Sequence, residues 1–107
     1  MSRDWKAFLD DIILCCQKIQ RYTEGYDLEK LVEDDRTIDA VLRNLEIIGE
    51  AVTHLPEEIL QSMPQIDWRN IQGLRNVIAH GYFGIDKKIV WDIVTNKIPL
   101  LLAAINS

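Results

Sequence analysis

The chain has 107 residues, 48% of them hydrophobic and 27% charged, with a formal net charge of -5 at pH 7. This length supports one hydrophobic core, so we expect a single globular domain over residues 1–107. The acidic balance lacks the basic footprint of a typical nucleic-acid-binding protein, and no DNA partner is expected.

The apolar pattern and the cysteines argue against a membrane, secreted or zinc-binding protein. No apolar run approaches the ~20 residues of a membrane span, and the first residues lack the apolar segment of a signal peptide. We therefore expect a cytoplasmic protein without a membrane partner. Cys15 and Cys16 are adjacent, with no second cysteine pair and no histidine nearby, so neither a disulfide framework nor a zinc site is expected.

The first third of the chain predicts two helices. Apolar residues recur at three- and four-residue steps over Trp5–Ile19, which indicates an amphipathic helix from about Arg3 to Gln20. The segment 22–27 has the composition of a turn. Asp27 at its end is placed to cap a short helix, Leu28 to Glu33.

A longer helix follows, capped by Asp35 or Thr37 and ending at about Thr53. Its apolar stripe is wider than one neighbouring helix would cover. The second cover is either another helix of the same chain or a second copy of the protein. The stripe contains Ile38, Val41, Leu42, Leu45, Ile48 and Val52, and Ala40, Ile47 and Ala51 widen it.

Charged residues line the other side of this helix. Arg43, Glu46 and Glu50 recur at helical spacing, as on a solvated face with weak ion pairs. Glu50 and His54 are four residues apart. No third ligand lies at metal-site spacing, so we expect a simple hydrogen-bonded pair rather than a metal site.

The next two helices are marked by their ends. Pro56 suits the first position of a short helix that Met63 and Pro64 close. Asp67 is placed to cap a helix from Trp68 to about Ala79. Gly81 is expected to end this helix.

A final helix begins after Asp86, with a buried apolar stripe. Pro99 lies inside it, and a proline there removes a backbone hydrogen bond, so a kink is expected over residues 95–99. No run alternates with the period of a strand. The fold class predicted is all-α: an up-and-down bundle of four main helices with one or two short ones.

Three polar side chains of different chemistry gather near the end of the helix after Asp67. On an unbroken helix Arg75 and His80 would point about 140° apart, and ending the helix at His80 would let the imidazole approach Arg75. Tyr82 follows directly. The three residues are either a solvated charge, a polar helix end and a packing aromatic, or the lining of one pocket.

The local charge around this cluster differs from that of the whole chain. Residues 69–88 hold Arg69, Arg75, Lys87 and Lys88 against the single carboxylate of Asp86, a local net charge of +3. Such a confined basic patch suits brief contact with RNA phosphates. It also suits an acidic protein partner, and both interpretations stay open.

Spacing alone leaves the cluster ambiguous, but its sequence context is specific. Arg75, His80 and Tyr82 reproduce the R-x4-H-x-Y motif, and the chain resembles the HepT-like proteins of the HEPN superfamily over nearly its whole length. The matching segments are residues 43–51, 55–58, Trp68, 73–76, 80–86 and 90–91.

The resemblance implies a HEPN-like fold, a homodimer and a biological setting. HepT-like proteins are RNase toxins of toxin–antitoxin modules, with a composite site at the dimer interface that corresponds here to Arg75, Asn76 and His80. The antitoxin is a small nucleotidyltransferase that transfers AMP to the motif tyrosine, here Tyr82. The resemblance further suggests that Arg43 and Asn44 shape the dimer cleft.

The chemistry of the motif agrees with this setting without a metal or another cofactor. RNA carries its own nucleophile, the ribose 2′-hydroxyl. His80 could transfer the proton, and Arg75 could hold the phosphate and stabilise developing charge. The alternative is a non-catalytic helical module that docks a nucleotidyltransferase or holds a nucleotide through Arg75 and Lys87.

Overall fold

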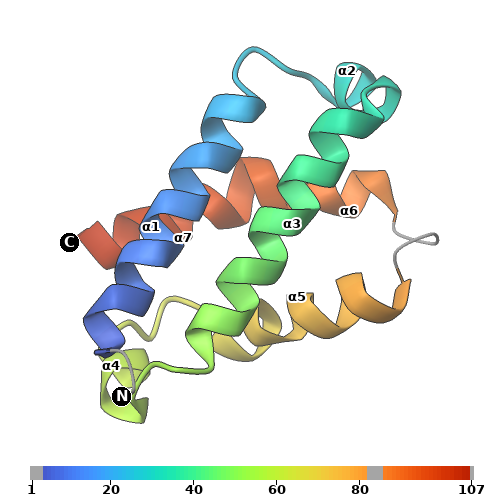
Figure 1. Cartoon of the computed structure of the whole chain (residues 1–107). Coiled ribbons are helices and arrows are strands. Elements are labelled where there is room, and N and C mark those ends of the chain that lie inside the picture. Colours follow the sequence, from blue (N-terminus) through green and yellow to red (C-terminus); the bar gives the residue numbers. More distant parts are fainter. Residues whose placement is uncertain (1–3, 82–85, 107) are drawn as a thin grey trace.

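The computed structural model describes residues 4–81 and 86–106, with side chains for residues 4–75 and 86–106. These ranges contain six helices and no strand (Figure 1). Four are the long ones: α1 (Trp5–Tyr22), α3 (Asp35–Val52), α5 (Trp68–Gly81) and a C-terminal helix made of α6 (Lys87–Asp92), a π-helical turn (Ile93–Lys97) and α7 (Ile98–Asn106). The short ones are α2 (Leu28–Glu33) and α4 (Glu57–Gln61).

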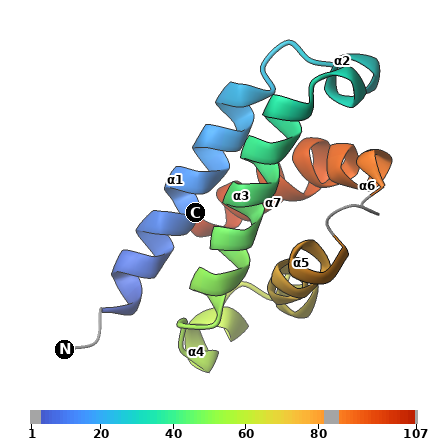
Figure 2. The same cartoon turned by 45° about the vertical axis from the view of Figure 1, so that its right-hand side comes forward.

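The long helices do not all run along one axis. In Figures 1 and 2, α1 and α3 lie side by side and antiparallel, whereas α5 and the C-terminal helix cross this pair obliquely. The all-helical class and the number of helices are as predicted, but the arrangement differs from a simple up-and-down bundle. A glycine on α3, described below, lets α5 cross α3 closely instead of aligning with it.

Helix α3 is the centre of the core. It packs against α1 and against α5, and the side chains of Val41, Leu45, Ile48 and Val52 are almost completely buried. Ala51 is buried and Ile47 partly buried against the same core. Two helices of the same chain therefore cover the wide apolar stripe, which gives no argument for a second copy.

The predicted caps are largely confirmed. Asp27 caps α2, Asp67 accepts a hydrogen bond from the backbone N–H of Asn70 at the start of α5, and Asp86 caps α6. Aspartates in these positions satisfy backbone N–H groups that lack a partner within the helix.

The predicted cap of α3 is wrong, because Asp34 fills this role and not Asp35 or Thr37. Its Oδ1 accepts the Thr37 backbone N–H at 3.0 Å, and its Oδ2 accepts the hydroxyl groups of Tyr26 at 2.6 Å and Thr37 at 2.7 Å. These hydrogen bonds, that of Tyr26 foremost, lower the pKa of Asp34 to about 2.

Two other helix starts and ends also differ from prediction. Pro56 is the N-cap of α4 and not its first residue. Helix α5 continues through Gly81, two residues beyond the predicted end, so His80 lies within its last turn. The helix therefore does not end at His80, and the departure from helical geometry expected at this residue is not observed.

Pro99 is accommodated without a break in the helix. The five residues before Ile98 form a π-helical turn, and such single-turn bulges are one of the known causes of irregularity inside an α-helix. Thr95 adds a hydrogen bond from its hydroxyl to the carbonyl of Trp91 at 2.8 Å. The irregularity lies at the predicted place but takes the form of a widened turn.

By length and composition alone, the helix Lys87–Asn106 could cross a membrane. The core helix of a compact protein can have the same length and composition. Here the helix buries one face against the core through Val90, Val94, Ile98, Leu101 and Ala104. The helix thus packs one face on the core, while 28% of its most apolar window is buried.

Candidate functional site

Arg75 lies where α5 crosses α3. Its Nη1 donates a hydrogen bond to Glu50 Oε2, and the two side chains, 41% and 53% exposed, form an ion pair reachable from solvent. The hydrogen bond from Arg75 lowers the pKa of the Glu50 carboxyl below its ordinary value. Glu50 therefore stays ionised, and its charge partly neutralises that of Arg75.

The close approach of the two helices depends on Gly49, which is buried on α3. A Cβ atom at this position would lie 3.2 Å from both the backbone nitrogen of Arg75 and the carbonyl oxygen of Ile71. Such contacts are tighter than a side chain normally makes. The absence of a side chain at Gly49 thus brings the next residue, Glu50, within reach of Arg75.

A second group contacts Glu50 from the turn after α3. His54 Nε2 lies 3.5 Å from Glu50 Oε1, which is the pair that the sequence predicts. The imidazole stacks on the Phe8 ring of α1, with centroids 4.2 Å apart and planes at 8°. Phe8 on α1 is thereby linked through His54 and Glu50 to Arg75 on α5.

These side chains border a shallow groove of about 420 Å³ where the three helices meet. Its lining contains Phe8, Asp11, Arg43, Glu46, Ile47, Glu50, Ala51 and Arg75. Arg43 Nη1 lies 3.8 Å from Glu46 Oε2. Asn44 does not contribute, because it is buried and its amide donates to the Ala40 carbonyl at 2.8 Å.

The other motif residues fall partly or wholly outside the described residues. The backbones of Asn76 and His80 belong to α5, but their side chains lie outside the described part, and Tyr82 lies wholly outside it. Of the predicted motif cluster, the structure thus places only the side chain of Arg75. The expected convergence of Arg75, His80 and Tyr82 stays a prediction.

The residues of the predicted phosphate patch are not gathered at one place. Arg69 lies in the first turn of α5, and α6 with Lys87 and Lys88 begins near the opposite end of that helix (Figure 1). Lys87 Nζ lies 3.1 Å from the carbonyl oxygen of Val32 and 3.3 Å from Asp35 Oδ1. Lys88 is exposed.

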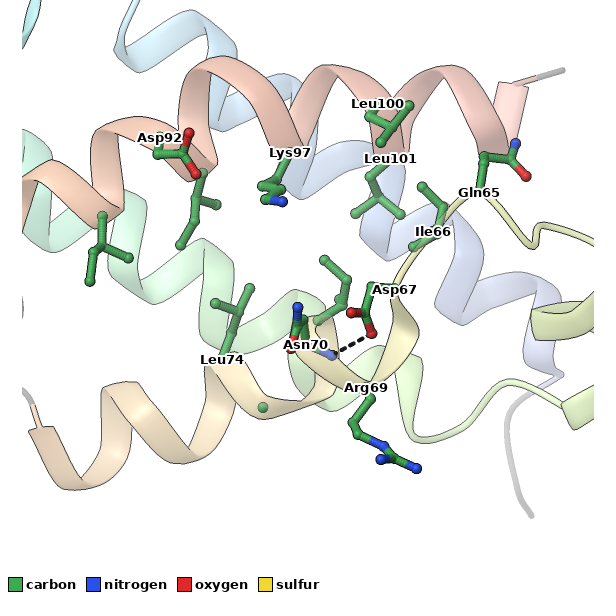
Figure 3. A pocket seen from close by; sticks show the side chains of 14 residues that line it. Gln65, Ile66, Asp67, Arg69, Asn70, Leu74, Asp92, Lys97, Leu100 and Leu101 are labelled. Carbon is green, nitrogen blue, oxygen red and sulfur yellow. Dashed lines mark hydrogen bonds between the residues drawn. The ribbon is translucent and has the colours of Figure 1, made fainter.

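A second pocket, of about 410 Å³, opens between α5 and the C-terminal helix (Figure 3). Leu74, Leu101 and Ile66 point into it, whereas the side chain of Arg69 points away. The pocket lining is thus mainly apolar. Among the side chains that the structure describes, those of residues 4–75 and 86–106, no group of three His, Cys, Asp or Glu is placed to hold a metal ion.

Comparison with known proteins identifies the family. The model of the family described as "Ribonuclease HepT-like" matches residues 12–107. The chain belongs to the HepT-like ribonuclease family. The matched region includes the complete motif from Arg75 to Tyr82.

Individual relatives agree with this assignment of the HepT-like chain. It is 42% identical over 98 residues to "Putative RNase MJ0127" of Methanocaldococcus jannaschii, covering 92% of this chain and 81% of the relative. It is 37% identical over 101 residues to "Probable ribonuclease HepT" of Thermococcus cleftensis, covering 94% and 92%. No solved structure matches the chain.

Sequence reasoning missed two contributors to the surroundings of Arg75 in this HepT-like protein. Gly49 interrupts the apolar stripe of α3, and a glycine in such a stripe is a signal for close helix contact. The sequence places Glu50 on a charged, solvated helix face and pairs it with His54, but it gives no sign of Arg75 as a partner. Its contact with Arg75 spans 25 positions in the sequence and has no local signal.

Proposed function

We propose that this chain is a metal-independent endoribonuclease in which Arg75 and His80 carry the reaction. The match to the HepT-like ribonuclease family over residues 12–107, with the motif complete, is the observation that carries the proposal. The exposed guanidinium of Arg75 supports it, because a phosphate group can reach this side chain from solvent.

The reaction uses the chemistry of RNA itself. The 2′-oxygen attacks the adjacent phosphorus, a 2′-O–P bond forms, and the P–O5′ bond breaks. One imidazole accepts the 2′-hydroxyl proton, and another donates a proton to the leaving 5′-oxygen. The Arg75 guanidinium stabilises the charge that develops on the non-bridging oxygens. Asn76 supports the phosphate as a neutral donor.

One chain supplies one motif histidine, whereas this reaction needs an acid and a base. We propose a homodimer of HEPN type in which the two His80 side chains face one shared groove. Sedimentation equilibrium at several protomer concentrations tests this assembly. A monomer at the concentrations at which the protein cleaves RNA would refute the shared groove.

RNA cleavage in the presence of EDTA tests the catalytic assignment. Wild type is expected to cut a pool of cellular RNAs, whereas Arg75→Ala and His80→Ala abolish cleavage. Arg21→Ala is the matched control, because Arg21 is an exposed arginine in the last turn of α1. Cleavage that persists in both motif variants would assign the activity to a contaminant or to another site.

We further propose that the enzyme is the toxin of a type VII toxin–antitoxin system in the cytoplasm. A nucleotidyltransferase antitoxin would neutralise it by AMPylation: the Tyr82 phenol oxygen attacks the α-phosphate of ATP and pyrophosphate leaves. The bulky anionic adduct would repel RNA from the groove. The test is mass spectrometry after incubation with ATP and the antitoxin, with Tyr82→Phe as control; adducts found only elsewhere would reject this target.

A second candidate function has its own supporting observations. The chain is acidic overall, and Arg75 is already paired with Glu50. Both features favour a non-catalytic module that docks a nucleotidyltransferase or holds a nucleotide. Absence of cleavage by a folded wild-type protein that still binds the nucleotidyltransferase would favour this function. Loss of RNA binding on changing Arg69, Lys87 or Lys88 would instead support separate phosphate contacts by these residues.

A further inference from the structure

Among the described side chains, that of Glu50 holds the Arg75 guanidinium from one side. Its Nη1 donates to Glu50 Oε2, and both side chains remain about half exposed. A guanidinium has five N–H donors in one plane, and a single carboxylate oxygen occupies only part of this set. The remaining donors stay available to a phosphate oxygen, in the orientation that Glu50 imposes.

Glu50 is itself connected to the rest of the fold. Its second oxygen faces His54, 3.5 Å away, and the His54 ring stacks on Phe8 of α1. Phe8 packs against the core. A continuous series of contacts therefore leads from the hydrophobic core through Phe8, His54 and Glu50 to Arg75.

The close approach of α3 and α5 determines that this series of contacts ends at Arg75. Gly49 brings α3 so close to α5 that an added Cβ would lie 3.2 Å from the Arg75 nitrogen. Glu50, the next residue, meets Arg75 as a consequence of this helix contact. Exposed ion pairs contribute little to stability, so stability alone does not account for such a supported pair.

We propose that Glu50 is a positioning residue that orients the Arg75 guanidinium for phosphate in RNA cleavage. The inference rests on the proposed ribonuclease function, in which Arg75 acts on the phosphate. Glu50 does not touch RNA; it acts through Arg75, with His54 holding its other oxygen. Correct placement of a group relative to the reacting atoms has a large effect on rate.

Steady-state cleavage kinetics test the proposal in two Glu50 variants. Glu50→Gln retains an oxygen that accepts from Arg75, and kcat is expected to fall roughly 10-fold; Glu50→Ala removes it, and kcat falls roughly 100-fold. KM for RNA should stay equal or decrease, because each change removes a negative charge that repels RNA. A decrease in KM would exclude a loss of folded protein, which lowers the apparent kcat at unchanged KM; where KM stays equal, circular dichroism separates the two.

Glu24→Gln is the matched control. It removes the same charge from an exposed residue in the turn after α1, outside the lining of the groove that contains Glu50 and Arg75. Its kcat should equal that of wild type. A similar loss of kcat in this variant would attribute the effect to charge and refute positioning by Glu50.

A spectroscopic measurement follows the contact itself. The Nε–Hε resonance of Arg75, identified by its absence in Arg75→Ala, is expected to shift in Glu50→Gln and to stay unchanged in Glu24→Gln. Circular dichroism checks that each variant is folded. If Glu50→Ala fails to fold, Glu50→Gln decides the question.

The outcomes separate this inference from the proposed function. A wild-type protein without cleavage activity refutes both. An active wild type with unchanged kcat in Glu50→Gln and Glu50→Ala, or an unshifted Arg75 resonance, refutes positioning alone. An increase in kcat on removing Glu50 also refutes it and shows that the carboxylate competes with phosphate for Arg75.

Discussion

Replacing Gly49 by alanine tests the close contact between α3 and α5. Alanine in place of glycine inside a helix contributes roughly 0.5–1 kcal/mol through helix propensity. Against this gain, the new methyl group would lie 3.2 Å from two backbone atoms of α5, the Arg75 nitrogen and the Ile71 oxygen. Backbone atoms within a helix do not rotate aside, so α5 as a whole must move.

Overpacking of a well-packed contact costs typically about 1–3 kcal/mol. We therefore expect Gly49→Ala to lower the free energy of unfolding by up to about 2 kcal/mol after the gain in propensity. Gly73→Ala is the matched control, because no atom lies within 4 Å of a Cβ at Gly73 on α5. This variant should gain about 0.5–1 kcal/mol.

Urea denaturation at one fixed protomer concentration measures both variants. The m-values should equal that of wild type, so that the midpoints report stability. The difference between the two variants isolates the helix contact, and about 1–3 kcal/mol is expected. If Gly49→Ala were as stable as Gly73→Ala, the two helices would not be held together at this glycine.

Three further predictions follow from described contacts. The folded-state pKa of Asp34 is about 2, below its unfolded value of ~3.9. Its contribution to stability is therefore complete above the unfolded pKa and is lost as the pH falls through the folded pKa. Tyr26→Phe should reduce the loss of stability that an acid titration measures between pH 5 and 2. Burial raises the pKa of the Cys16 thiol to about 12, so alkylation by iodoacetamide at pH 8 should be slow until denaturant is added. Lys87 contacts the Val32 carbonyl and Asp35, so Lys87→Ala should lower the free energy of unfolding by less than about 1 kcal/mol. Lys88→Ala should leave it unchanged, and a larger loss for Lys88→Ala than for Lys87→Ala would contradict the stabilising role given to the Lys87 contacts.

Features set by neighbouring residues could be predicted from the sequence. The caps Asp27, Asp67 and Asp86 were identified because a capping side chain and its backbone partner lie within three residues. The cap of α3 was misassigned, since several candidates occur close together and the hydroxyl of Tyr26, eight residues away, contacts Asp34.

Features that depend on how helices cross could not be predicted. The pair of Arg75 and Glu50 requires α5 to approach α3 at Gly49, which no local pattern specifies. Likewise, the wide apolar stripe of α3 could be covered by a second helix of the same chain or by a second copy of the protein, and only the packing of α5 on α3 decides between them. The family was recognisable from the motif and its context, whereas the positions of His80 and Tyr82 relative to Arg75 stay predictions.

The π-helical turn before Pro99 has a consequence for the whole chain. A break at the proline would leave two pieces shorter than the ~12–15 residues at which an isolated helix becomes even marginally stable. Instead the C-terminal helix is one rod of 20 residues, about 30 Å long. It contacts α2 at its beginning and α1 near its end. One continuous helix therefore packs against both α2 and α1, two segments far from it in the sequence, so the placement of both depends on the same helix.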